Sequence, residues 1–394
     1  MIEAFGLQPR EIFLIVFALL IGGLMFLDRK KVNRHFILFY RRTKRGLEYI
    51  DMVARAAPRF WNAYGWAGAF VGFFSIVGAL AMIVYTFFTM FQTQSLEQGP
   101  SLVLPGTASQ PQFQAGVSFI PAEYWVIGIA ILMFVHEMSH GIVARIEGFE
   151  INSVGWVVLG IIPGAFVEPK GEQMLPGDDG EPSATSGAMW EQGNWKSRIK
   201  VLAAGSFANY VTAIVFLLLS MGIVSAVSTD SGVFYNAQDG LPAANAGMTN
   251  GTLYQIDNIT IDNLNDLQTA SNQLRVNQTV NVQTSEGNFT MIAGEHPNQD
   301  TGYIGINVGQ TTLVKEEYEE ERGFLIWFTS LLSTVALLNF LIGLFNMLPI
   351  KPLDGGLIIE TLITEFSVEE NLKYLHAFST IAWTALMGTV VVSI

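Results

Sequence analysis

The residues best suited to chemistry are His136, Glu137 and His140, which form the pattern HExxH. Two histidines four residues apart stand on one face of a helix, so both rings can reach a single metal ion. Glu137 projects beside them and can hold a water molecule without binding the metal. A chance match on a helix that buries two hydrogen-bonded histidines is the alternative. The pattern lies within an apolar run, residues 124–144, where ionisable groups are costly and usually functional.

The composition is that of a membrane protein. The chain has 394 residues, of which 14% are charged, and a mean hydropathy of +0.38. Several apolar runs are long enough to cross a bilayer. There is no cysteine, so a transition metal must bind to His, Asp or Glu, which suits zinc. The net charge of −13 argues against nucleic acid as a partner.

The apolar runs predict a polytopic α-helical membrane protein with about six transmembrane helices. The first run is short for a span and resembles a retained anchor rather than a cleaved signal peptide. We expect the spans at residues 12–27, 66–91, 123–145, 201–227, 324–348 and 372–394. They define an N-terminal pair of helices (residues 1–92) and two halves of a membrane core, residues 123–227 and 324–394.

Charge asymmetry predicts the orientation. Residues 28–65 carry ten Lys or Arg, which places this loop in the cytoplasm by the positive-inside rule. Residues 93–122 carry none and are expected outside, as is the N-terminus. His136 lies 13 residues from the outer end of its span, or ~20 Å at 1.5 Å per residue. The two histidines should therefore lie in the cytoplasmic half of the bilayer.

Two stretches outside the spans have a pattern of their own. Residues 151–167 are apolar but β-branched and interrupted by glycine and proline, which predicts strands or a re-entrant hairpin embedded in the membrane. Residues 172–194 form a polar, glycine-rich loop. Residues 228–312 are polar and show short alternating runs, which predicts an inserted β-rich domain. Within it, residues 279–284 and 289–293 flank a turn and predict a hairpin.

A catalytic zinc site needs a third protein ligand. His35 and His296 are poorly placed in loops, and His376 fits helix packing. Asp354 is the better candidate, because it follows an inward-running span and lies on the same side as the two histidines. The prolines before it end the helix, and the two glycines after it allow close approach of the backbone. A simple turn or a helix N-cap at Asp354 remains the alternative.

Asn346 to Gly355 read NxxPxxxLDG, and this motif, after an earlier HExxH span, resembles the site-2 protease family of intramembrane zinc metalloproteases. Gly205 to Asn209 resembles the family's GxxxN element, with Ser206 where proline is frequent. Residues 160–169 resemble its membrane-embedded β-loop. The resemblance implies that His136, His140 and Asp354 bind Zn²⁺ and that Glu137 is the catalytic base. It also implies that Asn346 supports the substrate backbone; for Asn209 the alternative is a tie between helices.

The inserted segment resembles a PDZ domain of the bacterial and archaeal type. The resemblance rests on residues 241–248 and 251–257, with Thr252 where aspartate is usual. Domains of this kind bind an extended chain or a carboxyl terminus by strand addition. We therefore expect residues 228–312 to dock substrates or to filter them.

Together these expectations describe regulated intramembrane proteolysis of single-span transmembrane proteins in the lipid bilayer. Two other classes compete. A non-catalytic scaffold or pseudo-protease would hold a structural metal, but a structural site has no use for a general base such as Glu137. A divalent-metal transporter would call for acidic and histidine residues on more spans than are seen.

Overall fold

The computed structural model describes residues 9–393 except 36–37, 94–98, 108–111, 115, 160–161, 170–189, 191–192, 230–232, 239, 296–300, 310–312 and 319. The polar loop expected at 172–194 therefore lies almost wholly outside the described residues. The chain forms two compact units, residues 1–218 with 330–394, and residues 219–329.

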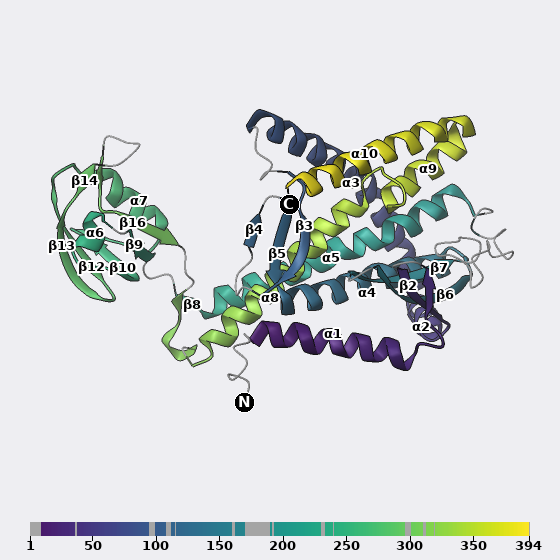
Figure 1. Cartoon of the computed structure of the whole chain (residues 1–394), viewed down its shortest axis with the longest axis horizontal. Coiled ribbons are helices and arrows are strands. Elements are labelled where there is room, and N and C mark those ends of the chain that lie inside the picture. Colours follow the sequence, from purple (N-terminus) through teal and green to yellow (C-terminus); the bar gives the residue numbers. More distant parts are fainter. Residues whose placement is uncertain are drawn as a thin grey trace. The chain divides into compact units, whose positions relative to one another are not determined.

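Long apolar helices dominate the fold (Figure 1). Among the described residues, five helices are long and apolar enough to cross a membrane, so the chain is a multi-pass membrane protein. They match the second to sixth predicted spans: α3 (Pro58–Thr93), α4 (Ala122–Ile146), α5 (Trp195–Val227), α8 (Arg322–Asn346) and α10 (Leu372–Ser393).

The first predicted span is the helix α1 (Pro9–Leu27), whose apolar portion, Glu11–Gly23, is shorter than a span. A sixth crossing therefore stays a prediction. A shorter helix, α9 (Asp354–Phe366), follows the break after α8. The helix α2 (Leu47–Ala56) packs on α4, where Ile50 and Ala54 share a buried cluster with Ile142.

The predicted hairpin at 151–167 is present as β6 (Ile151–Leu159) and β7 (Ile162–Pro169). It belongs to a four-stranded antiparallel sheet in the order β1-β2-β6-β7, which places β7 at an edge. The other two strands, β1 (Asn33–His35) and β2 (Leu38–Thr43), come from the basic loop. Sequence reasoning assigned that loop only a role in orientation.

The segment between α3 and α4 also contains strands that were not predicted. The strands β3 (Leu102–Gly106), β4 (Gln112–Gln114) and β5 (Val117–Pro121) form a small sheet in the order β3-β5-β4. Trp125 at the start of α4 donates a hydrogen bond to the Val103 carbonyl, 3.1 Å away. This sheet is therefore tied to the first turn of the helix that carries HExxH.

The second unit contains the predicted β-rich domain. Its main sheet has the order β13-β12-β10-β9-β16, and β11 pairs with β10. The predicted hairpin is present, with Thr284 paired to Gly287 across a two-residue turn. The elements are β8 (Ser228–Thr229), β9 (Val233–Ala237), α6 (Pro242–Asn245), β10 (Asn250–Ile256), β11 (Ile259–Thr260), α7 (Leu264–Gln273), β12 (Thr279–Thr284), β13 (Gly287–Ile292), β14 (Gly294–Glu295), β15 (Gly302–Tyr303), β16 (Ile306–Gly309) and β17 (Leu313–Val314).

Alternation builds the core of this domain. The strand β12 reads exposed and buried in turn, which sends Val280 and Val282 inward against Leu253 and Ile256 of β10. Asn263 caps α7 in a capping box with Asp266, so the helix begins at a fixed residue.

Candidate metal centre

The helix α4 presents His136 and His140 on one face, as their spacing requires. Their Nε2 atoms lie 3.0 Å apart, and the two rings meet edge to face. His136 is buried, with 7% of its surface exposed. Two ring nitrogens that converge in this way define one point that both can contact.

Asp354, 218 residues after His136 in the chain, reaches the same point. Its Oδ2 atom lies 3.3 Å from His136 Nε2 and 3.6 Å from His140 Nε2. The three candidate ligand atoms all lie within 4.8 Å of one another, and no fourth His, Cys, Asp or Glu of the described residues joins them. Asp354 Oδ2 is also buried, with no hydrogen-bond partner among the described residues. A cation shared with the two rings would satisfy it.

The main chain around residues 347–356 sets the position of Asp354. Asp354 is the first residue of α9, and Leu353 is the N-cap of this helix. The alternative prediction, in which Asp354 is the N-cap, therefore does not describe this helix. A Cβ atom on Gly355 would lie 2.3 Å from the Met347 carbonyl oxygen, and one on Gly356 would lie 2.6 Å from that of Ile350. Both distances are shorter than any real contact, so the two glycines allow the approach that the sequence predicts.

His140 is oriented by the backbone of α5. Its Nδ1 atom lies 2.7 Å from the Val201 carbonyl oxygen. A carbonyl oxygen can only accept, so Nδ1 carries the proton and donates. In the neutral ring Nε2 then keeps a free lone pair directed at His136 and Asp354, which is the tautomer that a metal ligand needs.

Asn209 of α5 plays the corresponding part for His136. It is fully buried, its Nδ2 atom lies 3.1 Å from His136 Nδ1, and its Oδ1 atom has no partner among the described residues. Rotating the amide by 180° would bring Oδ1 to the ring instead, where it could accept a hydrogen bond from the Nδ1–H group. That orientation satisfies the oxygen and leaves His136 Nε2 free. The contact joins α4 to α5, as the alternative of a tie between helices implies.

Gly205 leaves open the space in front of the two rings. A Cβ atom at this position would lie 2.4 Å from His140 Nε2 and 2.7 Å from His136 Nε2. Any side chain here would therefore occupy the point on which the ligand atoms converge. Ser206, the next residue of α5, is buried. The GxxxN element thus supplies both the gap and the amide beside His136.

Glu137 lies next to the ligands in sequence but contacts a different element. Its Oε2 atom accepts a hydrogen bond from the Val167 N–H group of β7, 2.9 Å away. Ser139, between the two histidines, donates to the Tyr64 hydroxyl at 3.0 Å. The carboxylate of Glu137 is therefore held against the edge strand of the sheet.

Asn346 is the last residue of α8 and is half-buried. Its contact with a substrate backbone stays a prediction. Sequence reasoning missed the Val201 carbonyl and the Val167 N–H group, because backbone groups carry no residue-type signal. The role of Gly205 could have been found, since a glycine four residues before Asn209 shares its helix face.

The arrangement offers two imidazoles, one carboxylate and an adjacent unligated glutamate, which is the donor set of a three-ligand catalytic metal site. Comparison with known proteins agrees with it. The chain matches Peptidase family M50 over residues 124–387, more than half its length, and belongs to this family.

Two relatives are similar over most of their length. An uncharacterized protein of Methanocaldococcus jannaschii is 23% identical over 98% of this chain and 99% of its own. A protein of Clostridium perfringens, named as a candidate zinc metalloprotease, is 26% identical over 68% of this chain and 95% of its own.

Proposed function

We propose that this protein is a zinc-dependent endopeptidase that hydrolyses peptide bonds of transmembrane substrate proteins. The observation that carries the proposal is the convergence of His136, His140 and Asp354 beside Glu137. Membership of Peptidase family M50 supports the hydrolytic class, and the five apolar helices support a site within the membrane.

The three residues fit zinc. Zinc takes nitrogen and oxygen ligands, and catalytic sites keep three protein ligands and an open position. Asp354 Oδ2 has no hydrogen-bond partner in the described part of the chain, and the gap at Gly205 leaves room. When bound, zinc would polarise the scissile carbonyl and lower the pKa of water.

Glu137 acts as the general base. Its carboxylate takes the proton of the attacking water and returns it to the leaving amine. The hydrogen bond from the Val167 N–H group holds one carboxylate oxygen at 2.9 Å and leaves the other for the water.

The edge strand β7 supplies a place for the substrate. A helix hides its carbonyls in its own hydrogen bonds, so a transmembrane substrate must unwind before it is cut. An extended segment can then pair with the outer edge of β7, the strand whose Val167 contacts Glu137. Asn346 supports the substrate backbone nearby. For Asn209, the contact with His136 favours a role in orienting that ring over one in binding substrate.

The inserted domain selects substrates. Residues 228–312 resemble a PDZ domain, and the described sheet ends in the edge strands β13 and β16. We place this domain and the N-terminus outside, and the metal centre in the cytoplasmic half of the bilayer, from the positive-inside rule. Regulated intramembrane proteolysis follows as the process. Unchanged cleavage of every substrate after deletion of residues 230–312 would exclude the role of this domain.

Replacement of the base tests the catalytic assignment. Glu137→Gln keeps the size of the side chain but cannot take a proton, so cleavage of a transmembrane reporter should fall by roughly 10²- to 10⁴-fold. Zinc content, measured by elemental analysis of the purified protein, should stay at the wild-type level.

Cleavage, zinc content and zinc transport into vesicles together separate the alternatives. A scaffold or pseudo-protease would bind zinc and cleave nothing even as wild type. A transporter would move zinc across a vesicle membrane. Cleavage of the reporter would then not depend on Glu137, so Glu137→Gln would leave it unchanged. Full cleavage by the Glu137→Gln protein would refute the proposed role of this residue.

A further inference from the structure

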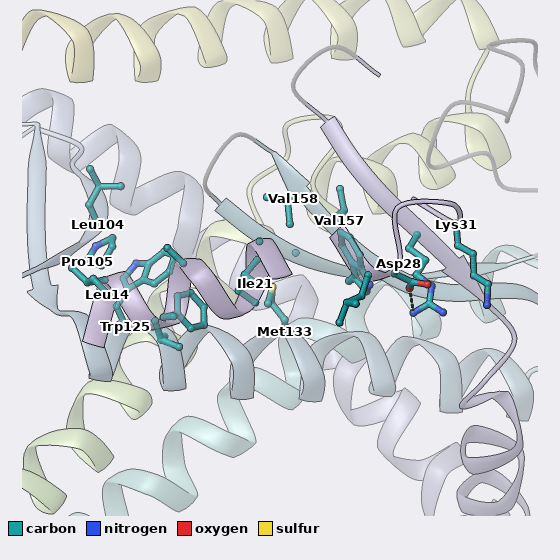
Figure 2. Close-up of a pocket in the computed structure, with 18 of the residues that line it drawn as sticks. Leu14, Ile21, Asp28, Lys31, Leu104, Pro105, Trp125, Met133, Val157 and Val158 are labelled. Atoms are coloured by element: carbon teal, nitrogen blue, oxygen red, sulfur yellow. Dashed lines mark ion pairs between the residues drawn. The ribbon is translucent and has the colours of Figure 1, made fainter. Parts of the chain in front are cut away.

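A large cavity lies in the first unit, and none of the three metal-ligand candidates lines it. It has a volume of about 1000 Å³ and lies between α1, α4 and the sheet that contains β6 and β7. Figure 2 shows Leu14 and Ile21 of α1, Trp125 and Met133 of α4, and Val157 and Val158 of β6 around it. This volume is at the upper end for small-molecule sites in proteins.

The two ends of the cavity differ in chemistry. Leu14, Leu104, Pro105 and Trp125 lie at one end of the view, and Asp28 and Lys31 lie at the other (Figure 2). The charged side chains that line the cavity are Lys31, Arg41, Arg45 and Asp28, three cations and one anion. The walls are otherwise almost entirely apolar, so the cavity is amphiphilic and its charged lining is net positive.

The charges that line the cavity are incompletely matched. Asp28 Oδ2 lies 2.5 Å from Arg41 Nη1 and compensates that guanidinium. Arg41 Nε is nevertheless buried without a hydrogen-bond partner among the described residues. Lys31 and Arg45 form no side-chain ion pair within the described part of the chain. An acceptor with several oxygens could satisfy all three cations together.

We propose that this cavity binds an anionic phospholipid of the bilayer. The acyl chains lie along the apolar face between α1 and α4, and the headgroup phosphate contacts Lys31, Arg45 and Arg41 Nε. Basic pockets between transmembrane helices bind anionic headgroups in this way. A neutral lipid would leave the cations without a counter-charge, and a free phosphate would leave the apolar walls empty. The proposal does not depend on the proposed protease activity.

Lipid retention by the full-length protein tests the proposal. The wild type is placed in nanodiscs of equal phosphatidylglycerol and phosphatidylcholine, extracted in mild detergent, and its bound lipid is identified by native mass spectrometry. We expect phosphatidylglycerol to be retained at least tenfold over phosphatidylcholine. Lys31→Gln with Arg45→Gln should reduce this preference by at least tenfold, since each cation near an anionic headgroup is worth roughly fivefold.

A matched control removes the same charge elsewhere. Lys30 and Lys44 are exposed neighbours that do not line the cavity, and Lys30→Gln with Lys44→Gln should keep the preference. Ala18 lines the cavity from α1, so Ala18→Trp should fill its apolar part and lower the retention of every lipid.

Four results would overturn the proposal. Equal retention of both lipids by the wild type would show that the cavity does not recognise an anionic headgroup. An equal loss in both double variants would mean unspecific attraction to a charged surface. Displacement of the lipid by inorganic phosphate would point to a plain anion site. Displacement by a single-span apolar peptide, with no dependence on lipid charge, would assign the cavity to a transmembrane substrate.

Discussion

His136 and Asp354 are 218 residues apart in the chain, yet Nε2 and Oδ2 lie 3.3 Å apart. In the inserted domain, by contrast, two turn residues separate β12 from β13, and the core forms within one contiguous stretch of chain. The metal centre therefore depends on how distant helices pack, whereas the inserted domain depends on local pairing. Changes at helix contacts should affect metal binding, and changes in the domain core should not.

The largest effect is expected at Gly205. Gly205→Ala places a methyl group 2.4 Å from His140 Nε2, so the rings or the helix must move. We expect zinc affinity to fall by at least about a hundredfold, measured by competition with a chelator. Gly222→Ala on the same helix, where no described residue lies within 4 Å of the added methyl group, should leave affinity unchanged. Wild-type affinity in the Gly205→Ala protein would mean that the approach of α5 does not set the site.

Asn209 tests the orientation of the His136 ring. Loss of a hydrogen bond to a metal-binding histidine typically costs 10- to 100-fold in metal affinity, and we expect this for Asn209→Ala. Asn209→Asp can only accept a hydrogen bond, so it should restore zinc affinity if Oδ1 faces the ring. If the aspartate variant binds zinc as weakly as the alanine variant, the amide nitrogen faces the ring and the proposed positioning role is wrong.

A core change in the inserted domain is the converse test. Leu253 is fully buried, and Leu253→Ala should destabilise the domain by about 2–5 kcal/mol. Hydrogen exchange should rise across β9, β10 and β12, while zinc content stays at the wild-type level. Ile292→Ala on β13, where the side chain is 62% exposed, is the control and should change neither. A loss of zinc with Leu253→Ala would break the contrast between the two regions.

The smallest effect is a pH dependence confined to the inserted domain. The Glu286 carboxylate accepts hydrogen bonds from Thr249, through its hydroxyl and its N–H group, and from the Tyr235 hydroxyl at 2.6 Å. These bonds hold the pKa of Glu286 below its usual range. A lowered folded-state pKa gives stability above the unfolded value that is lost as the pH falls through the folded value.

Burial and the bond to Glu286 raise the pKa of Tyr235 to about 12. A raised folded-state pKa gives stability below the unfolded value, near 10, that is lost as the pH rises towards about 12. Hydrogen exchange of the domain should therefore increase slightly below about pH 4 and above about pH 10. Glu286→Gln should flatten the acid limb. An unchanged acid limb in that variant would mean that this carboxylate is not responsible.

The sequence predicted those parts of the fold that local pattern determines. Long apolar runs predicted α3, α4, α5, α8 and α10, and alternation predicted the β12–β13 hairpin. The pairing of β2 with β6 was not predictable, because residues 38–43 include Arg41 and Arg42 and resembled a topogenic loop. The ion pair between Arg42 of β2 and Glu168 of β7, 3.1 Å long, shows that one of these charges also joins strands.

The site was predictable to the extent that side-chain types report it. His136, His140 and Asp354 carry metal-binding side chains, and the structure brings them together. Nothing in residue type could place the Val201 carbonyl at His140 or the Val167 N–H group at Glu137. Those contacts depend on where α5 and β7 pass α4, which is decided by packing over the whole unit.

The contacts of Gly355 and Gly356 fix the length of the segment between the end of α8 and Asp354. Both glycines lie against main-chain atoms of residues 347–351, and the buried side chains of Met347, Leu348 and Ile350 hold that segment in place. The number of residues from Met347 to Leu353 therefore sets the position of the Asp354 carboxylate. Adding or removing a single residue there would carry the ligand out of reach of both rings, whereas exchange of one buried apolar side chain for another of similar volume would leave it in place.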